Sequence, residues 1–166
     1  MSEPIALANA EATRAYGRTL AAALRAHAQH RVLIGLSGEL GAGKTTFVAG
    51  VLDASGVVGS IRSPTYTLVE PYELTNPPRT LYHLDLYRLR SAMELEDLGV
   101  RELLSGNTVL IVEWIENAPA LTAVTDLRLE FHYQPNGRIL RVDAQTPVGE
   151  ALGATLRQRG VTVHRS

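Results

Sequence analysis

Residues 31–45 read RVLIGLSGELGAGKT, and this stretch decides the fold. It opens with a mostly apolar run, residues 31–37, which is typical of a buried parallel strand. Residues 38–45 then match the phosphate-binding pattern G-x-x-x-x-G-K-S/T at every specified position. Apolar residues recur at helical spacing over 44–55, and Gly56 ends that run. This order of strand, glycine-rich loop and helix predicts a P-loop.

Phosphate chemistry explains each specified residue of the loop. Glycines let successive backbone N–H groups turn inward toward an anion, and the helix that follows adds the partial positive charge of its N-terminus. Lys44 can reach between the β- and γ-phosphates, and Thr45 can place a hydroxyl on Mg²⁺. A glycine-rich turn that binds nothing is the alternative, but the flanking strand and helix favour a site for a nucleoside triphosphate.

Lys44 is the only lysine among the 16 basic residues of the chain. Arginine therefore serves wherever a surface charge or an ion pair is needed. The guanidinium of arginine is planar and larger than an ammonium group, whereas the loop needs a compact charge beside the phosphates. We expect arginine to be a poor replacement at this one position.

The overall composition is that of one globular domain spanning residues 1–166, with 45% hydrophobic residues and a net charge of −1. The chain contains no cysteine, which excludes disulfides, thiolate zinc sites and cysteine nucleophiles and fits the reducing cytoplasm. No apolar run approaches the roughly 20 residues of a membrane helix, so we expect no membrane contact. The near-zero charge argues against a protein that grips a nucleic acid alone.

Hydrophobic periodicity and turn residues predict the remaining elements. Helices are expected over 9–29 with Asn9 as N-cap, over 91–104 with Ser91 and Glu94 spaced as a capping box, and over 147–160. Strands are expected over 65–74, 79–89, 108–114, 126–133 and 138–143, and the first two of these would form a hairpin. The combination predicts an α/β, P-loop NTPase-like three-layer sandwich with a mixed, partly antiparallel sheet.

Two acidic residues are candidates for binding a metal or orienting an attacking water. The strand period of two places His83, Asp85 and Tyr87 on one polar face. Glu113 ends the apolar run 109–112, where a P-loop protein carries an acid that holds Mg²⁺ through water or orients the attacking water. The alternative for both acids is an ordinary solvent-exposed carboxylate on a strand.

The hydroxyl-rich segment 63–70 lies between these motifs and includes Thr65. Such a segment can act as a switch whose threonine contacts the γ-phosphate or the metal. A simple turn that leads into a strand is the alternative interpretation.

The motifs GELGAGKTTF, SPTYTLVEPY, LYHLDLYRL and VEW, together with residues 94–101, resemble the bacterial TsaE (YjeE) family. Its members are small cytoplasmic P-loop ATPases needed to make N6-threonylcarbamoyladenosine on tRNA, next to the anticodon. The resemblance implies that ATP is the substrate, that Mg²⁺ is the cofactor and that hydrolysis is slow without partners. It implies TsaB and TsaD as those partners, with tRNA contacted through their complex.

The resemblance also implies roles for individual residues. Nucleotide contacts are expected from Leu40, Gly41, Ala42, Gly43, Lys44, Thr45, Thr46, Trp114, Glu116 and Gly137. Mg²⁺ is expected to be held by Thr45, Asp85 and Glu113. Glu113, Lys44 and the switch residue Thr65 are expected to take part in catalysis.

Two other functions remain open at this point. A small P-loop kinase that phosphorylates a nucleoside or metabolite would need a lid of clustered arginines, for which Arg88, Arg90 and Arg101 are available. A nucleotide-binding scaffold without catalysis would make Glu113 and Asp85 dispensable.

Overall fold

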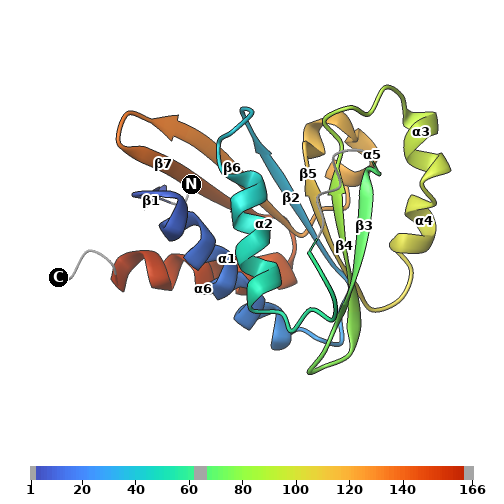
Figure 1. Cartoon of the computed structure of the whole chain (residues 1–166), viewed down its shortest axis with the longest axis horizontal. Helices are drawn as coiled ribbons and strands as arrows, with labels where there is room; N and C mark the ends of the chain where they lie inside the picture. Colours follow the sequence, from blue (N-terminus) through green and yellow to red (C-terminus); the bar gives the residue numbers. More distant parts are fainter. Residues whose placement is uncertain (1–2, 62–66, 163–166) are drawn as a thin grey trace.

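The apolar run that precedes the P-loop forms the central strand of the sheet. We analysed a computed structural model that describes residues 3–61 and 67–162. These residues form one open seven-stranded sheet in the order β1-β7-β6-β2-β5-β4-β3 (Figure 1). The central strand β2 (Val32–Gly38) lies parallel to both of its neighbours, β5 (Thr108–Glu113) and β6 (Leu127–Gln134).

The other strands make the two edges of the sheet antiparallel. On one side β4 (Arg79–Asp85) lies parallel to β5, and β3 (Val69–Leu74) pairs antiparallel with β4. On the other side β7 (Gly137–Ala144) pairs antiparallel with β6, and β1 (Ile5–Leu7) pairs antiparallel with β7. The predicted fold class, an α/β sandwich around a mixed sheet, is confirmed.

Helices cover both faces of the sheet. One layer contains α1 (Ala10–Arg25), α2 (Lys44–Asp53) and α6 (Pro147–Thr162), and the other contains α3 (Ala92–Asp97), α4 (Val100–Leu103), the 3₁₀ helix η1 (Ile115–Asn117) and α5 (Pro119–Thr122). Successive strand residues point to opposite faces, so Ile111 joins the core under α1 and α2 while Leu110 joins the core under α3 and α5.

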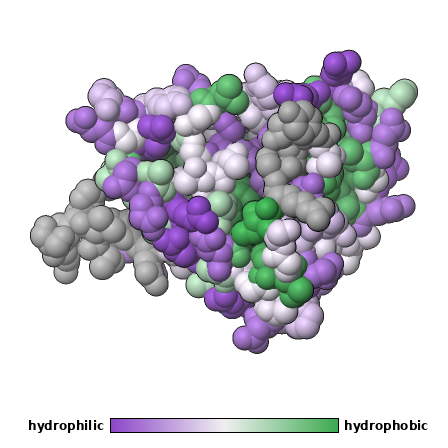
Figure 2. Space-filling model, viewed as in Figure 1, coloured by the Kyte–Doolittle hydropathy of each residue, from purple (hydrophilic) through white to green (hydrophobic). Residues whose placement is uncertain are grey.

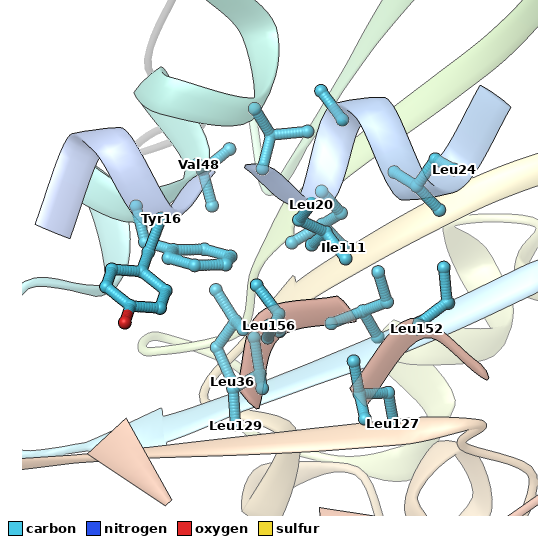
Figure 3. Close-up of a cluster of buried hydrophobic side chains, with 14 of the residues drawn as sticks. Tyr16, Leu20, Leu24, Leu36, Val48, Ile111, Leu127, Leu129, Leu152 and Leu156 are labelled. Atoms are coloured by element: carbon cyan, nitrogen blue, oxygen red, sulfur yellow. The ribbon is translucent and has the colours of Figure 1, made fainter. Parts of the chain in front are cut away.

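The larger core lies between the sheet and the layer of α1, α2 and α6. Figure 3 shows Leu20 and Leu24 of α1 on one side of this core and Leu129 of β6 on the opposite side, with Leu152 and Leu156 of α6 between them in this view. All five side chains are buried. This packing holds β2 and α2 in place, and the loop that joins them is the predicted P-loop.

Two glycines allow α1 and α2 to approach each other closely. A Cβ atom at Gly50 of α2 would lie 2.0 Å from the carbonyl oxygen of Arg14, and one at Gly17 of α1 would lie 2.1 Å from that of Phe47. No side chain can occupy either position without separating the two helices. The first helix therefore fixes the position of α2, and with it the end of the P-loop.

We expect the Gly50→Ala variant to be destabilised by about 2 kcal/mol, because the added methyl group overpacks the contact between α1 and α2. This is the opposite of the usual effect in a helix, where alanine is favoured over glycine by about 1 kcal/mol. Urea unfolding measures the difference. Ala22→Gly, at an exposed position of α1, is the control and should lose only the helix propensity. A Gly50→Ala protein that is more stable than the wild type would contradict this packing argument.

The first predicted helix, 9–29, is confirmed at its start and ends earlier than predicted. Asn9 caps it through a 2.8 Å hydrogen bond from the Ala12 N–H. Its last turn meets the buried guanidinium of Arg79 from β4, which donates to the carbonyls of Leu24, His27 and His30. A buried cation is favourable at this place, because the C-terminal end of a helix carries a partial negative charge.

The predicted helix 91–104 is wrong as one element. It divides into α3 and α4 around Gly99, whose φ of 71° is left-handed and interrupts the helical backbone. The side chain of Ser91 does cap α3 by accepting from the Glu94 N–H. The carboxylate of Glu94 accepts from the backbone of Arg90.

Several predicted boundaries also differ from the structure. The predicted strand 79–89 ends at Asp85, the described part of the predicted strand 65–74 begins at Val69, and the last helix extends to Thr162. β1, η1 and α5 are additional elements, each too short to show a periodic pattern in the sequence. None of the helices within 3–61 and 67–162 combines the length and the apolar character needed to cross a membrane.

Candidate functional site

Three parallel strands bring the predicted site residues together at their carboxyl ends. β2 ends at Gly38, β5 ends at Glu113 and β4 ends at Asp85. Asp85 is the register partner of Glu113, which in turn is the partner of Leu36. Ligands of open α/β sheets bind at this edge, outside the carboxyl ends of the strands.

The glycine-rich loop joins β2 directly to α2. Gly43 precedes the helix with a φ of 112°, a left-handed conformation that a side chain would strain. The N–H of Ala42 bonds to the carbonyl of Glu39 at 3.0 Å, which folds the loop tightly. The unpaired N–H groups of the first turn of α2 therefore lie beside the loop, as an anion site requires.

Lys44 is buried at the centre of this loop, with 4% of its surface exposed. Its ammonium group donates to the carbonyl of Gly38 and, at 3.0 Å, to that of Glu39. The same nitrogen lies 4.2 Å from the ring centroid of Trp114. Burial lowers the pKa of Lys44, and the charges of Glu113, Glu116 and Asp85 oppose this shift. The loop thus holds one compact cation among carbonyls, an aromatic ring and acidic groups.

Glu113 links the P-loop to β4. The hydroxyl of Thr45 donates to its Oε1 at 2.8 Å, and Nε2 of His83 lies 2.6 Å from its Oε2. Both His83 and Glu113 are 2% exposed, so the acid is not the solvent-exposed strand end that the sequence left open. Each oxygen of this buried carboxylate therefore has its own partner.

Asp85 borders the same space. Burial raises the pKa of its carboxyl, an effect that the hydrogen bond from the Tyr87 N–H opposes and the charge of Glu113 reinforces. The predicted polar face of this strand is confirmed for His83 and Asp85. Tyr87 lies beyond the end of β4, and its ring is 4.9 Å from that of Trp114.

A cavity of about 440 Å³ opens at this point. It is lined by Leu40, Gly41, Gly43, Lys44, Thr45, Thr46, Asp85, Tyr87, Arg88, Glu113 and Trp114. Most of the predicted nucleotide and metal residues thus share one cavity. Ala42 belongs to the loop but is buried beneath it, and Thr65 lies outside the described residues.

The last two predicted nucleotide contacts do not line that cavity but line spaces next to it. Gly137 lines a neighbouring space of about 310 Å³ that it shares with Asn9, Thr13 and the loop residues Gly41 and Gly43. Glu116 lines a separate open groove along the other part of the loop, together with Arg128 and Glu130. The structure therefore places Gly137 next to the P-loop on the side that faces the start of α1. Glu116 lies beside the main cavity but does not line it.

The hairpin of β6 and β7 holds the outer part of the loop, a contact that the sequence analysis missed. The hydroxyl of Tyr133 donates to the carbonyl of Leu40 at 3.0 Å, and Arg138 contacts that of Gly41 at 3.4 Å. The guanidinium of Arg138 also lies 4.2 Å from the ring centroid of Tyr133. The turn at 135–137 predicted the hairpin, but nothing in the sequence indicated what its tip would touch.

The oxygen atoms beside the loop fit a Mg²⁺ ion that a nucleotide would bring with it. Among the residues that the structure describes, no group of three or more His, Cys, Asp or Glu could hold a metal by itself. Thr45, Glu113 and Asp85 nevertheless offer oxygen ligands beside the loop. Mg²⁺ prefers oxygen, and in nucleotide sites it keeps few protein ligands and binds phosphate oxygens and water as well.

The surface around the site combines polar and apolar residues. Figure 2 shows hydrophilic residues over most of one face of the molecule, with hydrophobic residues gathered near its centre and its right-hand edge. At the cavity, Leu40 is 66% exposed and Tyr87 is 49% exposed. The rim of the cavity is therefore partly apolar, although its floor carries the charged groups.

Comparisons with known proteins identify the family of this chain. The family model "Threonylcarbamoyl adenosine biosynthesis protein TsaE" matches residues 7–140. The tRNA threonylcarbamoyladenosine biosynthesis protein TsaE of Haemophilus influenzae is 36% identical over 127 residues, covering 76% of this chain and 79% of that relative. The protein of the same name from Bacillus subtilis is 40% identical over 106 residues, covering 64% of this chain and 62% of that relative.

A solved structure shows the same architecture. The crystal structure of Bacillus subtilis YdiB matches with a TM-score of 0.69 and 27% sequence identity, and the match covers 95% of each chain. The residues that the family model matches include the P-loop, Asp85, Glu113 and Gly137. The chain belongs to the TsaE family.

Proposed function

We propose that the protein is a Mg²⁺-dependent ATPase that supports threonylcarbamoyladenosine modification of tRNA. One observation carries the proposal: the hydroxyl of Thr45 in the P-loop donates to the buried carboxylate of Glu113 at the end of β5. This contact joins the residue types that bind phosphate to an acid suited to orient water. The names of the relatives indicate the pathway.

In this proposal the loop backbone and Lys44 bind the phosphates, and Thr45, Glu113 and Asp85 would hold Mg²⁺. The ion, when bound, neutralises the charge that develops on the phosphates. Glu113 orients a water whose oxygen attacks the γ-phosphorus while the bond to the β–γ bridging oxygen breaks. ADP keeps that oxygen with its electron pair, and the attacking water releases one proton to the solvent as phosphate forms. Thr65 remains a proposed switch residue.

The proposed partners are TsaB and TsaD, and tRNA would be contacted through their complex in the cytoplasm. The net charge of −1 supports this arrangement, because a protein that gripped tRNA alone would be expected to carry excess positive charge. The partly apolar rim of the cavity also suits a protein that works within a complex.

We expect purified protein to hydrolyse ATP slowly and to hydrolyse it faster when TsaB and TsaD are added. Phosphate release over time, with and without the two partners, measures the difference. Omission of Mg²⁺ by chelation is the control and should reduce the rate in both conditions. Rapid turnover by the protein alone that does not respond to the partners would refute the proposed role.

The kinase alternative receives less support. Of the three arginines that a kinase lid could use, Arg88 lines the cavity whereas Arg90 and Arg101 do not. Arg101 lies on α4, where it is mostly exposed and pairs with Glu96. A cluster of arginines around a transferred phosphate is therefore not formed by these three residues.

A further inference from the structure

His83 is a buried polar residue to which the proposed reaction gives no task. It lies on β4 with 2% of its surface exposed, and it does not line the main cavity. Its register partner on β5 is Ile111, two residues before Glu113, so the side chains of His83 and Glu113 lie on the same face of the sheet. Nε2 of His83 is 2.6 Å from Oε2 of Glu113.

The partners of the two ring nitrogens assign the proton of His83. An ionised carboxylate can only accept hydrogen bonds, so the nitrogen that meets Glu113 must carry the hydrogen. Nδ1 is buried and has no hydrogen-bond partner among the described residues. A hydrogen on Nδ1 would be a buried unsatisfied donor, which is costly. The neutral ring with its hydrogen on Nε2 fits both observations.

We propose that His83 is a positioning residue that holds Glu113 by donating its Nε2–H to Oε2, and this proposal rests on the proposed ATPase function. With Oε2 occupied, Oε1 is the oxygen directed to Thr45 and the cavity. A glutamate side chain has several rotatable bonds, and fixing them in the protein costs free energy that this hydrogen bond helps to offset. His83 thus acts on the reaction through Glu113 and not by touching the nucleotide.

Two substitutions separate positioning from simple packing. His83→Leu fills the same place in the core with an apolar side chain but removes the donor, whereas His83→Gln keeps an N–H group near the place of Nε2. We expect His83→Leu to lower kcat about 10- to 100-fold with little change in the KM for ATP. Losses of this size are typical when a residue that orients a metal ligand through a hydrogen bond is replaced. His83→Gln should recover most of the lost kcat.

The chain supplies a matched control in a second histidine–glutamate pair. Nε2 of His132 lies 3.1 Å from Oε1 of Glu130 on the exposed surface of β6. His132→Leu removes a comparable contact at a place that does not line the main cavity, and it should leave kcat unchanged. A wild-type kcat in His83→Leu, or an equal loss in His83→Leu and His83→Gln, would overturn the positioning role.

The tautomer gives a readout that needs neither nucleotide nor metal. Long-range ¹H–¹⁵N correlation spectra of the protein without nucleotide should show His83 with its hydrogen on Nε2. The chain has five histidines, and the signals of His83 are identified as those that disappear in the His83→Gln protein. In Glu113→Ala the ¹⁵N shifts of His83 should change. A hydrogen on Nδ1, or unchanged shifts in Glu113→Ala, would refute the contact.

The two kinds of measurement also distinguish this proposal from the proposed function. If the wild type does not hydrolyse ATP under any condition, the ATPase function fails, whereas the spectra still decide whether His83 holds Glu113. If His83→Leu does not fold, as judged by urea unfolding, the comparison of His83→Gln with the wild type and the spectra of the wild type and Glu113→Ala still decide it.

Discussion

We expect the Glu113→Gln variant to hydrolyse ATP at least about a hundredfold more slowly than the wild type, because the loss of one positioned electrostatic group from an active site costs about 10²- to 10³-fold in kcat. The amide has the shape of the carboxylate, and its oxygen can still accept from Nε2 of His83 while its NH₂ group meets the hydroxyl of Thr45. The fold and the main cavity should therefore survive. The variant loses the negative charge that would orient water and hold the ion.

Single-turnover and steady-state phosphate release measure this effect, and calorimetric titration with ADP measures whether binding is retained. Glu130→Gln is the matched control, since Glu130 is an exposed acid on β6 that does not line the main cavity. In the reconstituted reaction with TsaB and TsaD, the variant should support fewer turnovers of threonylcarbamoyl transfer to tRNA. Wild-type hydrolysis, or an equal yield of modified tRNA over many turnovers, would remove Glu113 from the proposed role.

Local patterns in the sequence predict much of the fold. The strand and helix that flank the P-loop, the β6–β7 hairpin and the N-cap at Asn9 each depend on residues close together in the chain. Their patterns are therefore visible without knowing the tertiary structure. Gly99 shows where this fails. The capping box at Ser91 and the apolar pattern after it predict one helix, but Gly99 has a left-handed backbone that separates α3 from α4.

The order of the strands and the contacts between distant segments could not be predicted in the same way. β2 lies between β5 and β6, which follow it by about 70 to 100 residues, and it is this order that brings Glu113 to Thr45. The sequence places His83 on one face with Asp85, but it does not indicate that His83 contacts Glu113 or that Tyr133 contacts Leu40, for the same reason. Each contacts a residue far away in the sequence, and a residue type alone does not indicate such a partner.

The lone lysine leads to the second large effect. We expect Lys44→Met to weaken ATP binding about a hundredfold, because hydrogen bonds to charged groups contribute about 1.5 to 3 kcal/mol and this variant removes such donors together with the charge. Lys44→Arg keeps the charge, and we expect it to weaken binding or turnover at least about tenfold, or about 1.4 kcal/mol. The two variants separate the role of charge from that of shape.

The surroundings of Lys44 explain why shape matters. Its ammonium group is enclosed by the carbonyls of Gly38 and Glu39 and by the ring of Trp114, and 4% of the residue is exposed. A planar guanidinium needs more width than this space offers and would displace either the loop carbonyls or the indole ring. Displaced carbonyls would alter the loop backbone, whose N–H groups are proposed to bind the same phosphates.

Calorimetric titration with ATP and ADP gives the affinities of the two Lys44 variants, and phosphate release gives their rates. Arg101→Lys is the control, because Arg101 is exposed and the exchange of its cation should change neither quantity. Wild-type affinity and rate in Lys44→Arg would mean that the loop accepts arginine. The single lysine in a chain that otherwise uses arginine would then have no explanation in the structure of the loop.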